Sequence, residues 1–223
     1  MNKSSRITPK MLLAVIATVF VAGSAFAQDD EREERDAQKT KQAQAVSKEV
    51  YDKITKAQEQ VDAKDYQGAL RALNNLYDPD KLTEYEQANV LNYIGFDYYN
   101  MDDVPNAIRT YERMVAIPSL EPQMAKQTTY TLAQLYTMEE QYQKALQTLD
   151  KWFVMETNPA PDPFILKAQN LYQVQRYNEM IEPIQNAMRV AREREKPVKE
   201  DWYVLLNFAY FQEEDYKQVR DIQ

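Results

Sequence analysis

The sequence predicts an all-α fold in which pairs of helices are stacked one after another along the chain. Only three glycines occur among the 223 residues, whereas α/β and β proteins need glycine in phosphate-binding loops, tight turns and bulges. From residue 46 onward, apolar residues recur at the spacing of amphipathic helices. The pattern itself returns at intervals of 35 to 39 residues, which indicates a repeat architecture.

The first 27 residues have the organisation of a secretory signal sequence. Lys3, Arg6 and Lys10 precede the run "MLLAVIATVFVAGSAFA", which ends on the small residues Ala25 and Ala27. An uncleaved membrane anchor is the alternative, but the strongly apolar part is shorter than the roughly 20 residues that cross a bilayer. We expect cleavage after Ala27. Because the chain has no cysteine to acylate, we also expect a soluble exported protein.

Residues 28–45, "QDDEREERDAQKTKQAQA", are predicted to form a charged flexible tether, since they contain no large apolar side chain to bury. Loss of residues 1–27 removes three positive charges and changes the formal net charge from −8 to −11, which is 24 basic minus 35 acidic residues. Such a surface repels phosphate groups and anionic lipid headgroups. We therefore expect neither nucleic-acid binding nor membrane insertion of the mature protein.

Five similar segments follow in residues 46–223. They are "AQEQVDAKDYQGALRAL" from Ala57, "GFDYYNMDDVPNAIRTY" from Gly95, "AQLYTMEEQYQKALQTL" from Ala133, "AQNLYQVQRYNEMIEPI" from Ala168 and "NFAYFQEEDYKQVRDIQ" from Asn207. Their starts lie 38, 38, 35 and 39 residues apart. A hydrophobic residue follows nine positions after each start, and in the first three segments a small residue follows three positions later.

These features resemble the tetratricopeptide repeat (TPR), in which each unit is a pair of antiparallel helices. The unit that matches best carries the family's packing pattern at Leu91, Ile94, Gly95, Tyr98, Ala107 and Tyr111. The resemblance implies a right-handed α-solenoid of about five helix-turn-helix repeats over residues 46–223, with the fifth repeat stopping within its second helix. It also implies that the small residues allow close approach of the two helices.

Local signals predict where individual helices begin and bend. Thr83 and Glu86 have the spacing of a capping box, and Asp162 followed by Pro163 predicts an N-cap with proline at the first helical position. Pro183 lies inside the predicted second helix of the fourth repeat, where it removes a backbone donor. We expect a kink or a loosened turn there.

Composition argues against catalysis. The chain has no histidine and no cysteine, which removes the usual general base, the commonest zinc ligands and the thiol nucleophile. Two carboxylates suffice for glycoside hydrolysis, so a wall-active enzyme is a remote alternative. The candidates for it are Asp97, Asp102, Asp103, Glu139 and Glu140, most of which lie in predicted turns. We expect no catalytic residue, no cofactor and no metal.

A binding groove is predicted along the first helix of each repeat. Residues one position after the packing set are rotated by about 100 degrees from it and face the inner surface of the solenoid. Amides and aromatic rings dominate this set, and both suit an extended peptide or protein segment. The alternative for any single ring is support of a neighbouring repeat. The predicted groove residues are Asn89, Asn92, Phe96, Tyr99, Gln127, Tyr130, Gln134, Ile165, Gln169, Tyr172 and Phe208.

A more specific resemblance is carried by "YDKITKAQEQVDAKDYQGALRAL", "TYTLAQLYTMEEQYQKALQTLDKWF", "NPAP" and "KPVKEDWYVLLNFAYFQEEDY". These stretches are similar to periplasmic TPR proteins that accompany the TonB, ExbB and ExbD energy-transduction systems of Gram-negative bacteria. The resemblance implies a periplasmic, non-enzymatic scaffold for TonB-dependent transport. The alternative client is the Tol machinery, outer-membrane assembly or cell-wall synthesis. Neither the client sequence nor the oligomeric state follows from these residues.

Overall fold

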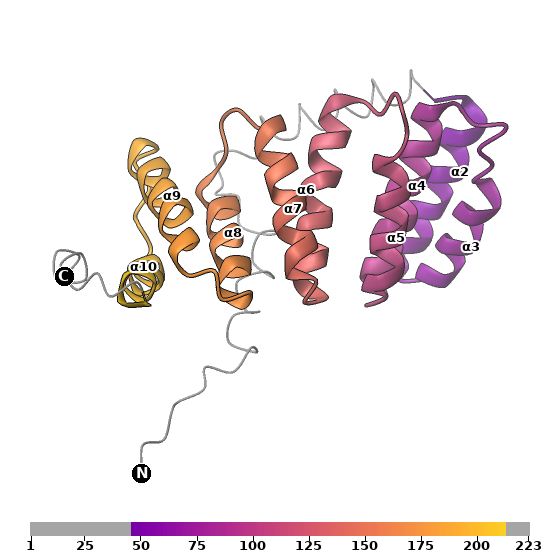
Figure 1. The fold of residues 1–223 in the computed structure, drawn as a ribbon. Helices are drawn as coiled ribbons and strands as arrows, with labels where there is room; N and C mark the ends of the chain where they lie inside the picture. Colours follow the sequence, from indigo (N-terminus) through magenta and orange to yellow (C-terminus); the bar gives the residue numbers. More distant parts are fainter. Residues whose placement is uncertain (1–45, 213–223) are drawn as a thin grey trace, which may run out of the picture. The chain divides into compact units, whose positions relative to one another are not determined.

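The computed structural model describes residues 46–212. Every described helix belongs to the unit Lys48–Gln223 (Figure 1). The predicted signal sequence and tether, residues 1–45, lie outside the described residues. Residues 213–223, which contain the predicted second helix of the fifth repeat, lie outside them as well.

The described chain is helical from end to end, with no strand among residues 46–212. Its elements are α2 (Lys48–Asp62), α3 (Tyr66–Leu76), α4 (Glu84–Asn100), α5 (Val104–Val115), α6 (Pro122–Met138), α7 (Tyr142–Met155), α8 (Pro161–Gln173), the 3₁₀ segment η3 (Asn178–Met180), α9 (Ile181–Glu193) and α10 (Glu200–Gln212). Helices that follow one another in the chain pack against each other, as Figure 1 shows. The predicted all-α fold of stacked helix pairs is confirmed.

We call α2, α4, α6, α8 and α10 the first helices, and α3, α5, α7 and α9 the second helices of their repeats. Three second helices begin at the hydrophobic residue that the sequence pattern marked, namely Tyr66, Val104 and Tyr142. The small residues Ala69, Ala107 and Ala145, three positions further on, are fully buried. The helical register of the repeats is therefore the predicted one.

The turn inside each repeat has the same backbone conformation. One residue per turn, Lys64, Asp102, Glu140 and Gln175, has a positive φ of 61°, 60°, 56° and 61° respectively. These residues lie 38, 38 and 35 positions apart, which is the period of the repeat. The next backbone N–H bonds back to a carbonyl five residues earlier, as from Asp103 to Tyr98 at 2.9 Å. This bond closes the end of each first helix and reverses the chain.

Two local predictions on helix starts have different outcomes. The capping box is present, because Thr83 accepts from the Glu86 N–H while the Glu86 side chain accepts from the Thr83 N–H. The N-cap predicted at Asp162 is wrong: α8 begins at Pro161, and Ala160 caps it without a side-chain hydrogen bond. Pro161 has a fixed φ and no N–H, so it starts the helix two residues earlier than predicted.

Pro183 acts at the start of a helix, not in its middle. The predicted second helix of the fourth repeat is divided into η3 and α9, and Pro183 is the third residue of α9. In the first turn of a helix the N–H that proline lacks would have no intrahelical partner. The helix is therefore not kinked at Pro183 itself. The irregularity that we expected from this proline is the 3₁₀ segment η3 immediately before α9.

Each repeat is held together where a small residue of the first helix meets a large residue of the second. Gly95 meets Tyr111, and Ala133 with Leu149 and Ala168 with Ile184 share hydrophobic clusters. Ala57 and Leu73 hold the equivalent positions of the first repeat, and every non-glycine residue of these pairs is at most 6% exposed. A Cβ atom added at Gly95 would lie 2.6 Å from Cζ of Tyr111. The largest small-to-large difference therefore occurs in the second repeat, where only glycine leaves room for the ring.

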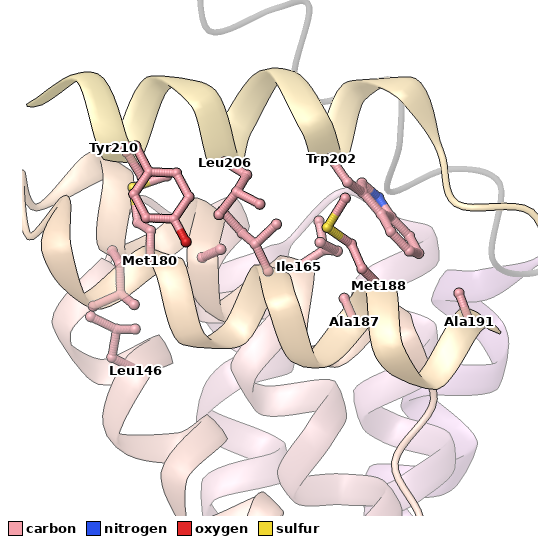
Figure 2. Packing of buried hydrophobic residues seen from close by; sticks show 13 residues of the cluster. Leu146, Ile165, Met180, Ala187, Met188, Ala191, Trp202, Leu206 and Tyr210 are labelled. Atoms are coloured by element: carbon pink, nitrogen blue, oxygen red, sulfur yellow. The ribbon is translucent and has the colours of Figure 1, made fainter. Parts of the chain in front are cut away.

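The last hydrophobic cluster joins the fourth repeat to α10. Figure 2 shows Trp202, Leu206 and Tyr210 of α10 along one side of it. Met180 and Met188 approach from η3 and α9. Burial of these side chains fixes α10 as the first helix of a fifth repeat.

We predict that Glu140→Gly stabilises the protein by about 1 kcal/mol, because glycine adopts positive φ without the steric cost that other residues incur. Glu139→Gly is the matched control. Glu139 has an ordinary φ of −85°, so glycine there only adds conformational entropy to the unfolded chain and should destabilise the protein. Urea unfolding measures both; equal effects of the two substitutions would contradict the role of the turn.

We predict that Gly95→Ala lowers the free energy of unfolding by about 1–3 kcal/mol, because its methyl group collides with the Tyr111 ring. The double variant Gly95→Ala, Tyr111→Leu reproduces the Ala133 and Leu149 pair of the next repeat. It should recover part of the loss, which a double-mutant cycle by urea unfolding would measure. Strictly additive effects would show that the two residues do not share this contact.

Candidate functional site

Three of the predicted groove residues form an exposed face on α4. Asn92, Phe96 and Tyr99 are spaced at i, i+4 and i+7, so they lie on one side of the helix. All three are exposed, and Phe96 and Tyr99 keep 41% and 39% of their surface accessible. Large apolar side chains are usually withdrawn from water, so two neighbouring exposed rings on a rigid helix are notable. We call these three residues the α4 face.

Two of the predicted groove residues do not line an open surface. Asn89 is 3% exposed, and its amide donates to the Tyr85 carbonyl at 2.8 Å within the same helix. Ile165 is 6% exposed and belongs to the cluster that joins α8, α9 and α10. The prediction failed for these two because neighbouring elements cover the first helices by different amounts from one repeat to the next.

Tyr130 supports the contact between the third and fourth repeats. Its ring centre lies 4.9 Å from that of Trp152, which is followed by Phe153 at 5.2 Å and Phe164 at a further 4.8 Å. Burial, with a smaller contribution from the charge of Asp162, raises the pKa of Tyr130 well above its usual range. The alternative considered for single rings, packing between repeats, therefore applies to Tyr130.

Tyr172 and Phe208 have a similar packing role between α8 and α10. The two ring centres lie 5.3 Å apart, and Tyr177 completes the cluster at 5.9 and 5.2 Å from them. Both rings are only half-buried, so each keeps an accessible edge. Among the predicted amides, Gln127 is exposed, while Gln134 and Gln169 are half-buried. The α4 face is consequently the most open part of the predicted groove.

Hydrogen bonds between successive first helices are a feature that the sequence reasoning missed. Nε2 of Gln58 in α2 donates to the hydroxyl of Tyr93 in α4 at 2.6 Å. Nδ2 of Asn170 in α8 donates to the hydroxyl of Thr137 in α6 at 2.9 Å. The sequence contained a signal for Asn170, because a polar residue two positions after the small packing residue Ala168 falls on the buried side of the helix. These bonds help to position one repeat on the next.

Asp97 occupies in α4 the position that Asn170 occupies in α8, two residues after the small residue. It is fully buried, and within residues 46–212 neither of its carboxylate oxygens has a hydrogen-bond partner. Burial raises the pKa of Asp97 from 3.8 to about 6, because an apolar surrounding disfavours the ionised form. The charge of Asp97 adds to burial in raising the pKa of Tyr111 on α5.

The other carboxylates considered for catalysis have structural surroundings. Asp103 caps α5, accepting from the Asn106 N–H at 3.2 Å and from its side-chain amide at 2.6 Å. Asp102 and Glu140 lie in the positive-φ turns, and Glu139 is the C-cap of α6. In the part of the chain that the structure describes, acidic side chains are not grouped so as to hold a metal ion.

The junction "NPAP" is held by a side chain from the following repeat. Nη2 of Arg194 donates to the Asn158 carbonyl at 2.9 Å, to the Asn158 side-chain oxygen at 2.8 Å and to the Pro159 carbonyl at 3.0 Å. Nearby, Lys126 forms an ion pair of 2.9 Å with Glu156. The stretch "NPAP", one of those that carry the sequence resemblance, is therefore fixed by these contacts on the path between α7 and α8.

We predict that Asp97→Asn stabilises the protein above pH 7 by about 2–3 kcal/mol, the free-energy equivalent of the raised pKa. The folded state holds the Asp97 proton more tightly than the unfolded chain does. The stability of the native protein therefore falls as the pH rises from about 4 through about 6, and the gap between variant and native protein opens over that interval. Urea unfolding at a series of pH values measures it.

A second variant for this test copies the hydrogen-bonded pair of Asn170 and Thr137 into the second repeat. Val61 lies at the position of Thr137, four residues after the small residue, so Val61→Thr added to Asp97→Asn would reproduce that pair between α2 and α4. We expect the double variant to be at least as stable as Asp97→Asn. A stability difference between Asp97→Asn and the native protein that does not change between pH 4 and pH 8 would contradict the account.

Within residues 46–212, no helix combines the length and the apolar character that a membrane crossing requires. The whole chain matches no protein-family model and no curated protein.

Solved structures of MamA proteins are similar to this chain in fold. MamA from Desulfovibrio magneticus RS-1 superposes with a TM-score of 0.61 at 16% identity, over 80% of this chain and 93% of that one. MamA of AMB-1 gives 0.61 at 17% identity over 78% and 87%, and MamA of MSR-1 gives 0.58 at 16% over 79% and 93%. At these identities the likeness concerns the fold, and it supports a TPR-type α-solenoid.

Proposed function

We propose that this protein is a non-enzymatic periplasmic scaffold that binds an extended segment of a partner protein on the α4 face. The observation that carries the proposal is the exposure of Phe96 and Tyr99 beside the exposed amide of Asn92. Rigid aromatic rings supply contact area at a low entropic cost, and an amide both donates to and accepts from a peptide backbone. A helical repeat array holds such groups in a fixed line.

The client we propose is a component of a TonB-dependent transport system, with TonB, ExbB and ExbD as the first candidates. The sequence resemblance to periplasmic TPR proteins of these systems supports this assignment, and the signal-like residues 1–27 support export. The same surface on a TPR-type fold is compatible with a Tol, outer-membrane assembly or cell-wall client. Fold alone does not select the partner.

A role without chemistry is supported by the state of the carboxylates. Asp97, whose pKa is raised by burial, is sealed from solvent, so a substrate cannot reach it unless the contact between α4 and α5 opens. Asp103 uses its carboxylate to cap α5. The absence of histidine and cysteine from the sequence points in the same direction.

We predict that Phe96→Ala, Tyr99→Ala abolishes capture of the native partner from cross-linked cells that express the tagged full-length protein. Both side chains are exposed, so their removal should leave the helical circular dichroism spectrum and the unfolding midpoint almost unchanged. The matched control is Val154→Ala, Met155→Ala, which removes two neighbouring apolar side chains that are 84% and 45% exposed on α7, a second helix outside the predicted groove. The control should capture the partner as the native protein does.

Identification of the captured proteins by mass spectrometry separates the candidate clients. TonB-system proteins that disappear with the α4-face variant would support the whole proposal. If the proteins lost with the α4-face variant belong instead to wall synthesis or outer-membrane assembly, the proposed client is wrong and the proposed binding surface is supported. If the α4-face variant still captures the partner and the control does not, the assignment of the binding surface to the α4 face is wrong.

A further inference from the structure

Resting on the proposed function, we propose that the segment bound by the α4 face is cationic. Its lysine or arginine side chains would lie over the rings of Phe96 and Tyr99 and reach the carboxylates of the turns that follow α4 and α6. We call Asp102, Glu139 and Glu140 the acidic turns. The inference depends on two independent features, the apolar face of α4 and the distribution of charge around it.

Among the first four repeats, the pair of exposed rings occurs in the second alone; the fifth has Phe208 and Phe211 at the same two positions, and Phe208 packs on Tyr172 and Tyr177. Position by position, Phe96 corresponds to Gln58, Gln134 and Gln169, and Tyr99 corresponds to Val61, Thr137 and Tyr172. Gln58, Thr137 and Tyr172 are already engaged with neighbouring repeats, through two hydrogen bonds and a ring contact. Phe96 and Tyr99 contact no other aromatic ring in the described chain and remain about 40% exposed. Their face on α4 is therefore available to a partner.

The helices around this face supply no free basic side chain. Helix α4 contains neither lysine nor arginine, and of its three acids Glu86 and Asp97 are buried, while Glu84 accepts from the Ser119 N–H at the other end of the helix. Helix α6 contains a single basic residue, Lys126, which is paired with Glu156. A segment lying along these two helices therefore meets no free lysine or arginine from either of them.

The acidic turns lie at the end of the repeats to which Tyr99 belongs. Asp102 follows Tyr99 by three residues, and its N–H donates to the Tyr99 carbonyl at 3.0 Å. Antiparallel pairing places the turn after α6, with Glu139 and Glu140, at the same end of the array. Asp102 and Glu140 are exposed and Glu139 half-buried, and among residues 46–212 these three form no ion pair.

Basic side chains near this end do not neutralise the acidic turns. Lys64, in the turn after α2, lies between Asp62 and Asp65. Nζ of Lys144 in α7 lies 5.3 Å from the centre of the Tyr136 ring. At the opposite end of the repeats, the acids Asp78, Glu156 and Asp162 are paired with lysines, whereas Asp80, Glu195 and Glu200 form no ion pair within residues 46–212.

Rings and carboxylates together recognise lysine and arginine. A cation is attracted to the face of an aromatic ring, and a nearby carboxylate adds a charge-assisted hydrogen bond. The chain already uses the first contact internally, where the guanidinium of Arg113 lies 4.7 Å from the centre of the Tyr77 ring. A surface with uncompensated negative charge also accelerates the encounter with a cationic segment and disfavours an acidic one.

The test uses the full chain and two short fluorescein-labelled peptides that differ only in charge, with the repeating sequences Lys-Thr-Leu and Glu-Thr-Leu. Fluorescence anisotropy should show binding of the lysine peptide and none of the glutamate peptide. Binding should weaken as salt is raised, because exposed charges are screened over about 8 Å at physiological ionic strength. Phe96→Ala, Tyr99→Ala should weaken it by about tenfold.

The charge variant is Asp102→Asn, Glu139→Gln, Glu140→Gln, in which asparagine is compatible with the positive φ of residue 102. Its control, Asp80→Asn, Glu195→Gln, Glu200→Gln, removes the same charge from exposed positions at the other end of the repeats. We expect weaker binding, by about tenfold or more, with the first variant only. Equal losses would mean that net charge attracts the peptide and would overturn the proposed site.

The proposed function and the charge inference fail in different ways. Two results would contradict the cationic segment and leave the proposed scaffold function in place. In the first, both peptides bind equally; in the second, neither peptide binds, while the native partner is still captured through Phe96 and Tyr99. If the lysine peptide binds unchanged to the α4-face variant, the assigned surface is wrong for both.

Discussion

The contact between a small residue of each first helix and a large residue of its second helix is the constraint on which the rest of the structure depends. It sets how closely the two helices approach at Ala57, Gly95, Ala133 and Ala168. Close approach in turn requires a short reversal, which the chain achieves with one residue of positive φ per repeat. Because contact and turn recur at one period, each repeat presents the same positions of its first helix to the next repeat.

The proposed binding surface lies in the second repeat, where the contacts between successive first helices differ from those of the other repeats. Between α6 and α8 the exposed positions are closed by the bond from Asn170 to Thr137 and by rings around Trp152. Within residues 46–212, no such bond or ring contact covers Phe96 and Tyr99 of the second repeat, and its buried polar position holds the carboxylate of Asp97, which has no hydrogen-bond partner among these residues. The repeat with the tightest internal contact thus carries two neighbouring exposed rings on its first helix. A firm support under a binding surface limits the entropy lost when a partner binds.

The sequence was sufficient for the helices because their signals are local. The pattern from Ala57 to Ala168 located the pairs, and Thr83 with Glu86 located the start of α4. Helix α8 was placed two residues late because Pro161 and Pro163 are both acceptable in a first turn. The groove was predicted less well, since exposure depends on coverage by other repeats. Neither the burial of Asn89 and Ile165 nor the ring contacts of Tyr130 and Tyr172 follow from helical phase alone.

The most direct test of the central claim, that the α4 face meets the partner, is site-specific photo-crosslinking in living cells. A photoreactive phenylalanine analogue would replace Phe96 in one strain and Val154, which is 84% exposed on α7, in another. The account predicts a crosslinked partner from position 96 and none from position 154. A partner crosslinked only from position 154 would contradict it, because binding would then take place away from the exposed rings of α4.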